Sequence, residues 1–231
     1  MGLKLYDLAG ASDNCRFSPF CWRVKMALRH KGLQVEEIPW RFTEKDIIAF
    51  SGQKLVPVLV DGDKIITDSW EIARYLEAAY PDSPSLVGGV VGEAEALFIK
   101  FWCEQIIHPL ILRIVLPDLF EHLHHQDQAY FRSSREQRFG MTLEEFASPT
   151  DETIATLNKA LAPLRSTLER QPYLGGVQPC FGDYIVFAAL AWARAVCAIK
   201  LLSPDDAVYV WRDRLLDKFD GYARSVAGYP V

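Results

Sequence analysis

The sequence predicts two domains of different class, a small α/β domain followed by a larger all-helical domain. In the first part of the chain, short apolar runs rich in β-branched residues alternate with stripes of helical spacing. Prolines and small polar residues then break the helical pattern and mark a linker. Beyond the linker the apolar residues keep helical spacing. We therefore place the α/β domain at residues 1–80, the linker at 81–92 and the all-helical domain at 93–231.

The elements of the first domain follow the order of a βαβ unit and then a ββα unit. In chain order we expect a strand at 3–6, a helix at 19–31, a strand at 35–39, an irregular segment at 42–52, a hairpin at 58–67 and a helix ending near 79. Asp61-Gly62-Asp63 supplies the turn of the hairpin. Written as βαβαββα, with the irregular segment in the place of the second helix, this is the order of a thioredoxin-like domain.

The second domain has three helical segments with clear apolar faces. They are expected from Glu93 to about His108, from Ile154 to Leu168 and from Ile185 to Leu202. Pro109 and Pro117 should kink or interrupt the helix that continues the first segment. The last segment is apolar nearly all round, which predicts the central buried helix of the domain. Cys180 and Asp183 resemble a capping box at its start, and Asp183 should carry most of the capping because a thiol is a weak acceptor.

The junction between the first strand and the first helix carries the tetrapeptide Ser18-Pro19-Phe20-Cys21. It resembles a redox Cys-Pro-Phe-Cys motif in which serine replaces the first cysteine. The free N–H groups and the dipole at a helix N-terminus lower the pKa of a sulfur held there. Because serine occupies the attacking position, the thiolate must belong to a substrate, which indicates a thiol-using transferase. Ser-Pro is also an ordinary helix start, so the tetrapeptide alone does not separate catalysis from capping.

Two later segments favour the functional interpretation of Ser18. Val56-Pro57 opens an apolar run, and a cis bond there would turn the N–H and C=O of Val56 toward a bound peptide. Asp68-Ser69 stands immediately before the last helix of the domain, and either residue could simply cap that helix. A helix start with free N–H groups, a hydroxyl and a carboxylate is also suited to hold the two charged ends of an amino acid.

Together these motifs resemble the cytosolic glutathione transferases, over essentially the full length of the chain. The segments that carry the resemblance are Ser18-Pro19, Lys54-Leu55-Val56-Pro57, Asp68-Ser69, Tyr75-Leu76, Tyr80-Pro81 and Gly175 to Asp183. Within that superfamily, residues 18–23, 27–32 and 134–137 are most similar to the bacterial lignin β-etherase branch and its fungal relatives.

The resemblance implies glutathione as co-substrate and gives its contacts. Ser18 would hydrogen-bond the glutathione sulfur and stabilise its thiolate, and Val56 would pair with the main chain of the cysteinyl residue. Asp68 and Ser69 would hold the γ-glutamyl end, and Phe20 is a further glutathione contact.

The contact to the glycine end of glutathione departs from the pattern of the family. Leu55 stands where the family often has Lys or Gln for the glycine carboxylate. Lys54 or Gln53 would then take that contact, and Lys54 is our candidate.

The implied reaction is attack of the glutathione thiolate on an electrophilic carbon of a hydrophobic, aromatic substrate. If the resemblance to the etherase branch holds, that carbon bears an aryl ether and a phenol leaves. The substrate should lie in an apolar cleft between the domains, and the candidates for its lining are Phe17, Trp40, Trp102 and Ile106. A protein that carries aromatic metabolites in this cleft without turnover is an alternative.

Two further expectations concern the surroundings of the cleft. The segment 130–149, with Arg132, Arg135 and Arg138 among polar residues, is either a solvated loop with one short helix or a lid over the cleft. The family resemblance also implies a homodimer.

Among the five cysteines, Cys15 is the rival of Ser18. It lies on the loop before the first helix, and as the nucleophile it would make the protein a thiol-disulfide reductase that forms a mixed disulfide with glutathione. The others are expected to pack as core residues; they are Cys21, Cys103, Cys180 and Cys197. An odd number of cysteines with no C-x-x-C pair and no signal peptide favours a reducing cytoplasm over a disulfide scaffold.

Composition and charge argue against other classes of function. The net charge of −5 is spread without a basic patch, so no nucleic-acid partner is expected. Arg194 and Lys200 interrupt the most apolar segment, so no membrane span is expected. His122, His124 and His125 lack acidic or thiol ligands at matching spacing, so no metal site is expected.

Overall fold

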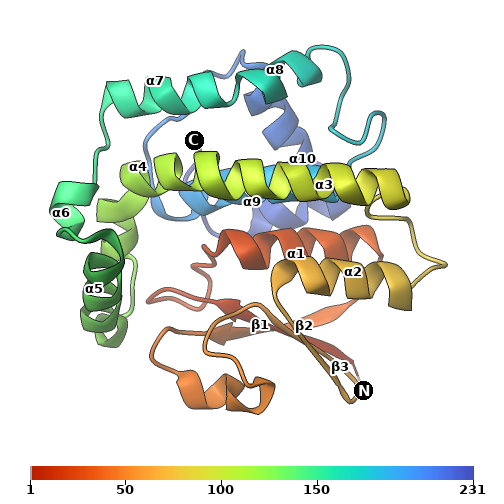
Figure 1. Cartoon of the computed structure of the whole chain (residues 1–231), viewed down its shortest axis with the longest axis horizontal. Helices are drawn as coiled ribbons and strands as arrows, with labels where there is room; N and C mark the ends of the chain where they lie inside the picture. The colour runs from red at the N-terminus through yellow and green to blue at the C-terminus, as the bar shows by residue number, and fades with distance from the viewer. Residues whose placement is uncertain (1) are drawn as a thin grey trace.

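The computed structural model describes residues 2–231 and contains an α/β part followed by a helical part (Figure 1). The elements of the first part are β1 (Leu3–Leu8), α1 (Pro19–His30), β2 (Val35–Trp40), η1 (Lys45–Ser51), β3 (Val58–Asp61), β4 (Lys64–Thr67) and α2 (Ser69–Ala79). Every predicted strand and helix of this part is present, and the segment predicted as irregular is mostly the 3-10 helix η1. The predicted fold class is confirmed.

The four strands form one mixed sheet in the order β2-β1-β3-β4. β1 runs parallel to β2 and antiparallel to β3, and β3 pairs with β4 as a hairpin. Figure 1 shows α1 and α2 between the sheet and the helical part. Helix α1 is therefore covered from both sides, which explains why it is buried along nearly its whole length.

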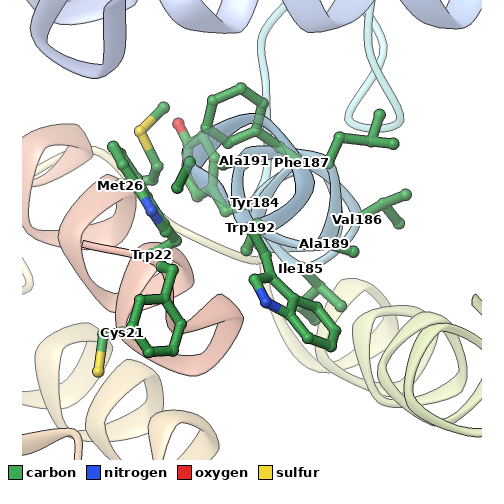
Figure 2. Packing of buried hydrophobic residues seen from close by; sticks show 14 of the residues in the cluster. Cys21, Trp22, Met26, Tyr184, Ile185, Val186, Phe187, Ala189, Ala191 and Trp192 are labelled. Atoms are coloured by element: carbon green, nitrogen blue, oxygen red, sulfur yellow. The ribbon is translucent and has the colours of Figure 1, made fainter. Parts of the chain in front are cut away.

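The second part contains helices only. Its elements are α3 (Val90–Trp102), η2 (Cys103–Ile107), α4 (His108–Glu121), α5 (His125–Phe139), α6 (Leu143–Phe146), α7 (Asp151–Ala160), α8 (Ala162–Leu168), α9 (Phe181–Val196) and α10 (Ala207–Ser225), which is interrupted at residues 218–221. α9 is the central helix, and Figure 2 shows its side chains beside Trp22 and Met26 of α1. No helix within residues 2–231 combines the length and the apolar character that crossing a membrane requires.

One helix begins earlier than the sequence predicted, and one predicted helix is divided into two. α3 begins at Val90, inside the predicted linker. Leu161 separates α7 from α8, where we expected one continuous helix. Pro163 lies in the first turn of α8, the helical position that tolerates a residue without an N–H.

Two other predictions for the helical part were wrong. The central helix ends at Val196 instead of reaching Leu202. A segment that is distant in the sequence satisfies a carbonyl of its last turn, since the N–H of Tyr229 donates to the C=O of Arg194 at 2.8 Å. The segment 130–149 is not mainly a loop, because most of it belongs to α5 and the short helix α6.

α3 and α4 are joined by a π-helical turn, η2. Pro109 follows this turn and has no N–H to donate to the carbonyl of Gln105, so the regular hydrogen-bond ladder cannot continue there. Pro117 lies inside α4 without ending it. The predicted interruption therefore occurs only at the first of the two prolines.

Asp183 is fully buried in the first turn of α9 and accepts four hydrogen bonds. The donors are the backbone N–H groups of Leu174, Gly175 and Cys180, at 2.8, 3.1 and 2.9 Å, and Nε1 of Trp211, at 2.8 Å. The predicted capping is present in the bond to Cys180. The same carboxylate also ties α9 to α10 and to the preceding loop.

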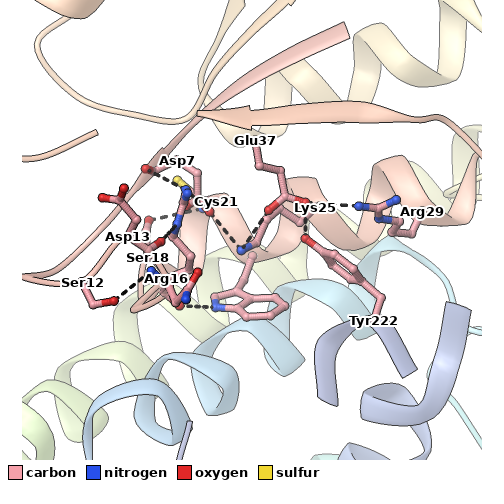
Figure 3. Close-up of polar contacts among 12 residues, drawn as sticks. Asp7, Ser12, Asp13, Arg16, Ser18, Cys21, Lys25, Arg29, Glu37 and Tyr222 are labelled. Carbon is pink, nitrogen blue, oxygen red and sulfur yellow. Dashed lines mark hydrogen bonds and ion pairs between the residues drawn. The ribbon is translucent and has the colours of Figure 1, made fainter. Parts of the chain in front are cut away.

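A cluster of buried charges lies beside the start of α1 (Figure 3). Oδ2 of Asp7 pairs with Nζ of Lys25 at 2.9 Å and with Nη1 of Arg16 at 3.3 Å. Lys25 is also 3.8 Å from Glu37, which accepts a hydrogen bond from the hydroxyl of Tyr222. The cluster thus joins β1, α1, β2 and α10 around the loop that precedes α1.

Candidate functional site

The predicted site segments lie together at one edge of the sheet. β1 ends at Leu8 and leads through a loop to the start of α1. β3 runs antiparallel to β1 with Val58 opposite Tyr6, so the residues before β3 lie beside the end of β1. β4 runs antiparallel to β3 with Thr67 opposite Val58, so the start of α2 reaches the same edge. The register therefore brings the starts of α1 and α2 and the segment before β3 together.

Ser18 is the N-cap of α1 and is buried. Its backbone is extended, with φ −67° and ψ 120°, as the N-cap position requires. Its Oγ accepts a hydrogen bond from the N–H of Cys21 at 3.3 Å. That bond does not use the hydroxyl hydrogen, which is left to donate to a ligand. Capping by Ser18 is therefore compatible with contact to a bound sulfur.

Val56 precedes Pro57 through a cis peptide bond. Within residues 2–231, neither the N–H nor the C=O of Val56 takes part in a hydrogen bond. Both groups are thus available to the main chain of an extended peptide, which is the arrangement that the sequence suggested.

Asp68 and Ser69 combine helix capping with unused polar groups. Oδ1 of Asp68 accepts from the N–H groups of Trp70 and Glu71, at 2.8 and 3.2 Å, so Asp68 is the N-cap of α2. Asp68 also has a positive φ of 67°, a backbone region that is rare for residues with a side chain and frequent at ligand sites. Ser69 is buried, and its Oγ has no hydrogen-bond partner within the described residues. A buried hydroxyl without a partner is costly, and a polar ligand would supply one.

A cavity of about 570 Å³ opens between the two parts of the molecule beside Ser18. Most of its lining is apolar or aromatic, and its residues are Leu8, Phe17, Ser18, Pro19, Phe20, Trp40, Phe42, Leu55, Val56, Glu104, His108, Pro109, Leu112, Leu119, Phe131, Arg135, Arg138, Phe139, Phe146 and Trp192. This size and composition suit a small hydrophobic molecule. The structure therefore brings the predicted residues Phe17, Trp40 and Phe20 to the same cavity as Ser18 and Val56.

Two predicted substrate contacts, Trp102 and Ile106, do not line this cavity. Glu104, His108 and Leu112 face it instead, at a spacing of one helical turn along η2 and α4. Trp102 and Ile106 lie two positions away from that row and therefore on another side of the helix.

The outer wall of the cavity comes from α5 and α6, which the sequence offered only as a possible lid. Asp127 of α5 is fully buried and fixes this wall to the first part of the molecule. Its carboxylate accepts from the N–H groups of Phe42 and Thr43, at 3.0 and 2.9 Å, and from the hydroxyl of Thr43 at 2.7 Å. No local signal in the sequence marks Asp127, since its partners are distant along the chain.

The segment before Val56 places Leu55, and not Lys54, against the cavity. Lys54 is exposed, and its C=O accepts a hydrogen bond from Nζ of Lys45 at 2.7 Å. The contact of Lys54 or Gln53 with a glycine carboxylate stays a prediction.

His108 faces the cavity as a neutral imidazole. Its ring packs edge-on against Phe20 and Trp192, and its Nε2 is buried without a partner among residues 2–231. Burial, together with the nearby cations Arg23 and Lys100, lowers the pKa of His108 to about 3. His108 therefore carries no charge at neutral pH.

Burial disfavours the thiolate form of the cysteines. Cys15 does not belong to the cavity lining, and burial raises the pKa of its thiol despite the opposing effect of Arg16. Burial also raises the pKa of Cys21 well above its ordinary value and that of Cys103, Cys180 and Cys197 to about 12. All five cysteines are free. Within residues 2–231, no group of three His, Cys, Asp or Glu side chains is placed to hold a metal ion.

Known proteins match both parts of the chain. The glutathione S-transferase N-terminal domain matches residues 14–84, and the glutathione S-transferase C-terminal domain matches residues 94–206. Glutathione S-transferase 3 of Zea mays is 25% identical over 225 residues, which are 87% of this chain and 96% of that protein. A zeta-class glutathione S-transferase of Euphorbia esula is 38% identical over 89 residues, and that match spans only 36% of each protein. The chain likewise spans 50% of the glutathione S-transferase-like protein ustS of Aspergillus flavus, at 29% identity over 55% of this chain.

Solved structures match the fold over nearly the whole chain. Glutathione transferase GSTFuA3 from Phanerochaete chrysosporium matches with a TM-score of 0.80 and 22% identity, over 96% of this chain and 97% of that one. A glutathione S-transferase of Ceriporiopsis subvermispora, solved in complex with glutathione, matches with a TM-score of 0.80 and 23% identity, over 96% of this chain and 98% of that one. At these identities the likeness establishes the fold.

The two matched domains cover most of the chain in the order in which they occur in the family, and the fold agrees with solved members. This family uses glutathione as its co-substrate. The chain belongs to the glutathione S-transferase superfamily.

Proposed function

We propose that the protein is a glutathione transferase in which Ser18 activates the glutathione thiol. The observation that carries the proposal is the place of Ser18, a buried hydroxyl at the N-terminus of α1 on the wall of an aromatic cavity. The thiolate attacks an electrophilic carbon of the second substrate, a C–S bond forms, and the leaving group departs with the electron pair of its former bond to that carbon. Binding supplies both the reactive thiolate and its proximity to the target, and no covalent bond to the protein is needed.

The energy needed to ionise the thiol is within reach of this site. A free thiol has a pKa of about 8.5, and lowering it by roughly two units requires about 3 kcal/mol. A hydrogen bond from the Ser18 hydroxyl to a charged sulfur contributes about 1.5–3 kcal/mol. The positive end of the α1 dipole contributes about 0.3–1 kcal/mol more.

The remaining contacts to glutathione follow from the same sheet edge. Val56 pairs with the cysteinyl main chain through its free N–H and C=O. Asp68 and Ser69 hold the γ-glutamyl end through the second carboxylate oxygen, the unpartnered hydroxyl and the start of α2. Phe20 borders the sulfur position, and Lys54 is the candidate for the glycine end.

For the second substrate we propose an aromatic electrophile, with a β-aryl ether as the first compound to test. The aromatic lining of the cavity supports an aryl group. Cleavage of such an ether releases a phenol and leaves a thioether with glutathione. This reaction needs reduced glutathione, which a reducing compartment such as the cytoplasm supplies.

We also propose a homodimer, built on the exposed side of α3. This helix carries five exposed apolar residues, which are Val90, Val91, Leu97, Phe98 and Phe101. Such a patch marks an interaction surface. Phe98→Lys should convert a dimer to a monomer in sedimentation velocity, and a wild-type protein that sediments as a monomer would refute the proposal.

The decisive experiment compares Ser18→Ala with Cys15→Ser in three assays, which are conjugation of a chlorinated nitrobenzene, cleavage of a β-aryl ether and glutathione-dependent reduction of a disulfide. The transferase proposal expects Ser18→Ala to lower kcat/KM about 10- to 100-fold, the loss that follows from removing the roughly 1.5–3 kcal/mol of thiolate stabilisation that the hydroxyl supplies. Cys15→Ser should keep the wild-type activity. The reverse result, with disulfide reduction lost in Cys15→Ser, would identify a reductase. Binding of glutathione and aromatic ligands without turnover in wild type would identify a carrier.

A further inference from the structure

Two arginines of α5, Arg135 and Arg138, line the cavity without a carboxylate partner among residues 2–231. The one side-chain hydrogen bond of Arg135 within the described chain goes to the hydroxyl of Ser134, at 3.0 Å. Arg132, on the same helix but outside the lining, instead pairs with Glu136 and Glu144 at 2.9 and 2.8 Å. The arginine of α5 that does not line the cavity is therefore neutralised by this chain, and the two that line it are not.

Aromatic rings hold the guanidinium of Arg135 in place. It lies over Phe131, 4.7 Å from the ring centre, and near Phe42, 5.5 Å from the ring centre. A guanidinium stacked on aromatic faces keeps its N–H groups free at its edges, which is the geometry that binds a carboxylate through two hydrogen bonds. Rings and cation together form a pocket for a planar group with a negative charge.

The electrostatic situation favours an anion at this place. Burial lowers the pKa of Arg135, and the charge of Arg138 lowers it further. Both effects disfavour the positive charge of Arg135, which no acidic side chain of the lining balances. Glu104 is the one acidic residue in the lining, and it is already bound by Arg23 at 2.7 Å and by Lys100 at 2.9 Å. A cation in an apolar site is stabilised strongly by a counter-ion, and this site has none of its own.

We propose that the second substrate is an aromatic acid, whose carboxylate is bound by Arg135, with Arg138 at the side of the cavity. The inference deepens the proposed transferase function and rests on it for the reaction, while the binding of the acid rests on the cavity alone. The aromatic part packs among the rings of the lining, such as Phe139 and Phe146, and the reacting carbon faces the thiolate at Ser18. A neutral aromatic compound of the same shape lacks the ionic contact and binds less tightly.

Glutathione itself offers a second source of the same chemistry, because its glycine ends in a carboxylate. Leu55 faces the cavity where the family often has Lys or Gln, so the glycine carboxylate, for which Lys54 is the candidate, has no cationic partner at that position. We favour the electrophile as the source, because the neighbours of Arg135 are aromatic rings that suit an aryl group better than a peptide backbone. The experiment separates the two sources.

The test uses a chloronitrobenzoate and the matching chloronitrobenzamide, which differ in charge and react in the same way with thiolates. Wild type, Arg135→Gln and Arg138→Gln are compared at saturating glutathione, and Arg132→Gln is the control on the same helix. Arg135→Gln should lower kcat/KM for the benzoate about tenfold or more, as the loss of a charged hydrogen bond does, and change the value for the benzamide less than about twofold. KM for glutathione should stay the same, Arg138→Gln should show a smaller loss, and Arg132→Gln should behave as wild type.

Two kinetic outcomes overturn the inference. If Arg135→Gln slows both electrophiles equally and raises KM for glutathione, the arginine binds the glycine carboxylate. If Arg135→Gln leaves the ratio of the two kcat/KM values unchanged, the cavity does not select acids.

A binding measurement keeps the inference testable if no turnover is found. Trp40 and Trp192 line the cavity, so quenching of tryptophan fluorescence reports binding of either compound in the presence of S-methyl glutathione, which cannot react. A preference for the benzoate that disappears in Arg135→Gln would support the anion site even though the transferase function had failed. Equal affinity for the two compounds in wild type would refute it.

Discussion

His108 should make the folded protein sensitive to mild acid. Its pKa is lowered to about 3 in the folded state by burial and by Arg23 and Lys100. In the unfolded chain a histidine has a pKa of about 6.5. As the pH falls below 6.5, the unfolded chain therefore binds a proton that the folded protein does not, so stability is lost between pH 6.5 and about 3.

The size of this loss follows from the two pKa values. Between pH 7 and pH 5, the unfolded state gains up to about 2 kcal/mol relative to the folded state from this one imidazole. His108→Gln removes the proton-binding group and keeps a neutral polar side chain of similar length. The variant should therefore lose about 2 kcal/mol less stability than wild type over the same pH interval.

The assay is urea unfolding at pH 7 and pH 5, at one protein concentration, for wild type, His108→Gln and the control His125→Gln. His125 is exposed, so its variant should keep the wild-type pH dependence. Other titrating groups are common to all three proteins and cancel in the comparison. If wild type and His108→Gln lose the same free energy of unfolding to within about 0.5 kcal/mol, the reasoning about this buried imidazole is wrong.

Three further predictions concern buried polar groups and thiols. Asp183→Ala should lower the free energy of unfolding by about 3–5 kcal/mol, because four buried donors lose their acceptor, and an unchanged urea midpoint would contradict this. Asp7→Ala should cost about 3–5 kcal/mol in the same assay, since Lys25 keeps only Glu37 at 3.8 Å; replacing both Asp7 and Lys25 by apolar residues should recover most of the loss, and a single variant as stable as wild type would refute the role of the pair. All five thiols should react more slowly with a thiol reagent in native protein than after unfolding, because burial raises the pKa of each; a thiol that reacts as fast in native protein as in the unfolded chain would be the contrary result.

Local signals in the sequence were sufficient for the α/β part. Ser18, Asp68 and the hairpin turn act through their immediate neighbours, so caps and alternating runs fixed the positions of the strands and helices. Once the strand order is known, the register alone brings the starts of α1 and α2 to one edge.

The helical part depends on contacts that no local pattern contains. The end of α9 is set by Tyr229, and α5 packs through Asp127, whose partners lie on the loop after β2. The cavity wall was therefore predicted only in part. Trp102 and Ile106 have the right chemistry, but they lie two positions away from the row of residues that faces the cavity, and tertiary packing decides which row that is.

The buried carboxylate of Asp127 also bears on how the enzyme would choose among electrophiles. Three hydrogen bonds attach α5 to the loop after β2, so the outer wall of the cavity is tied to the α/β part. A mobile flap that closes over each compound would adapt to many shapes, but it would lose conformational entropy in each binding event. A wall that is attached in this way fits fewer shapes of substrate, and it binds those substrates without a change in its own conformation. Exchanging the side chains of this helix should accordingly retune the range of compounds accepted, while the tripeptide pocket at the sheet edge keeps its form.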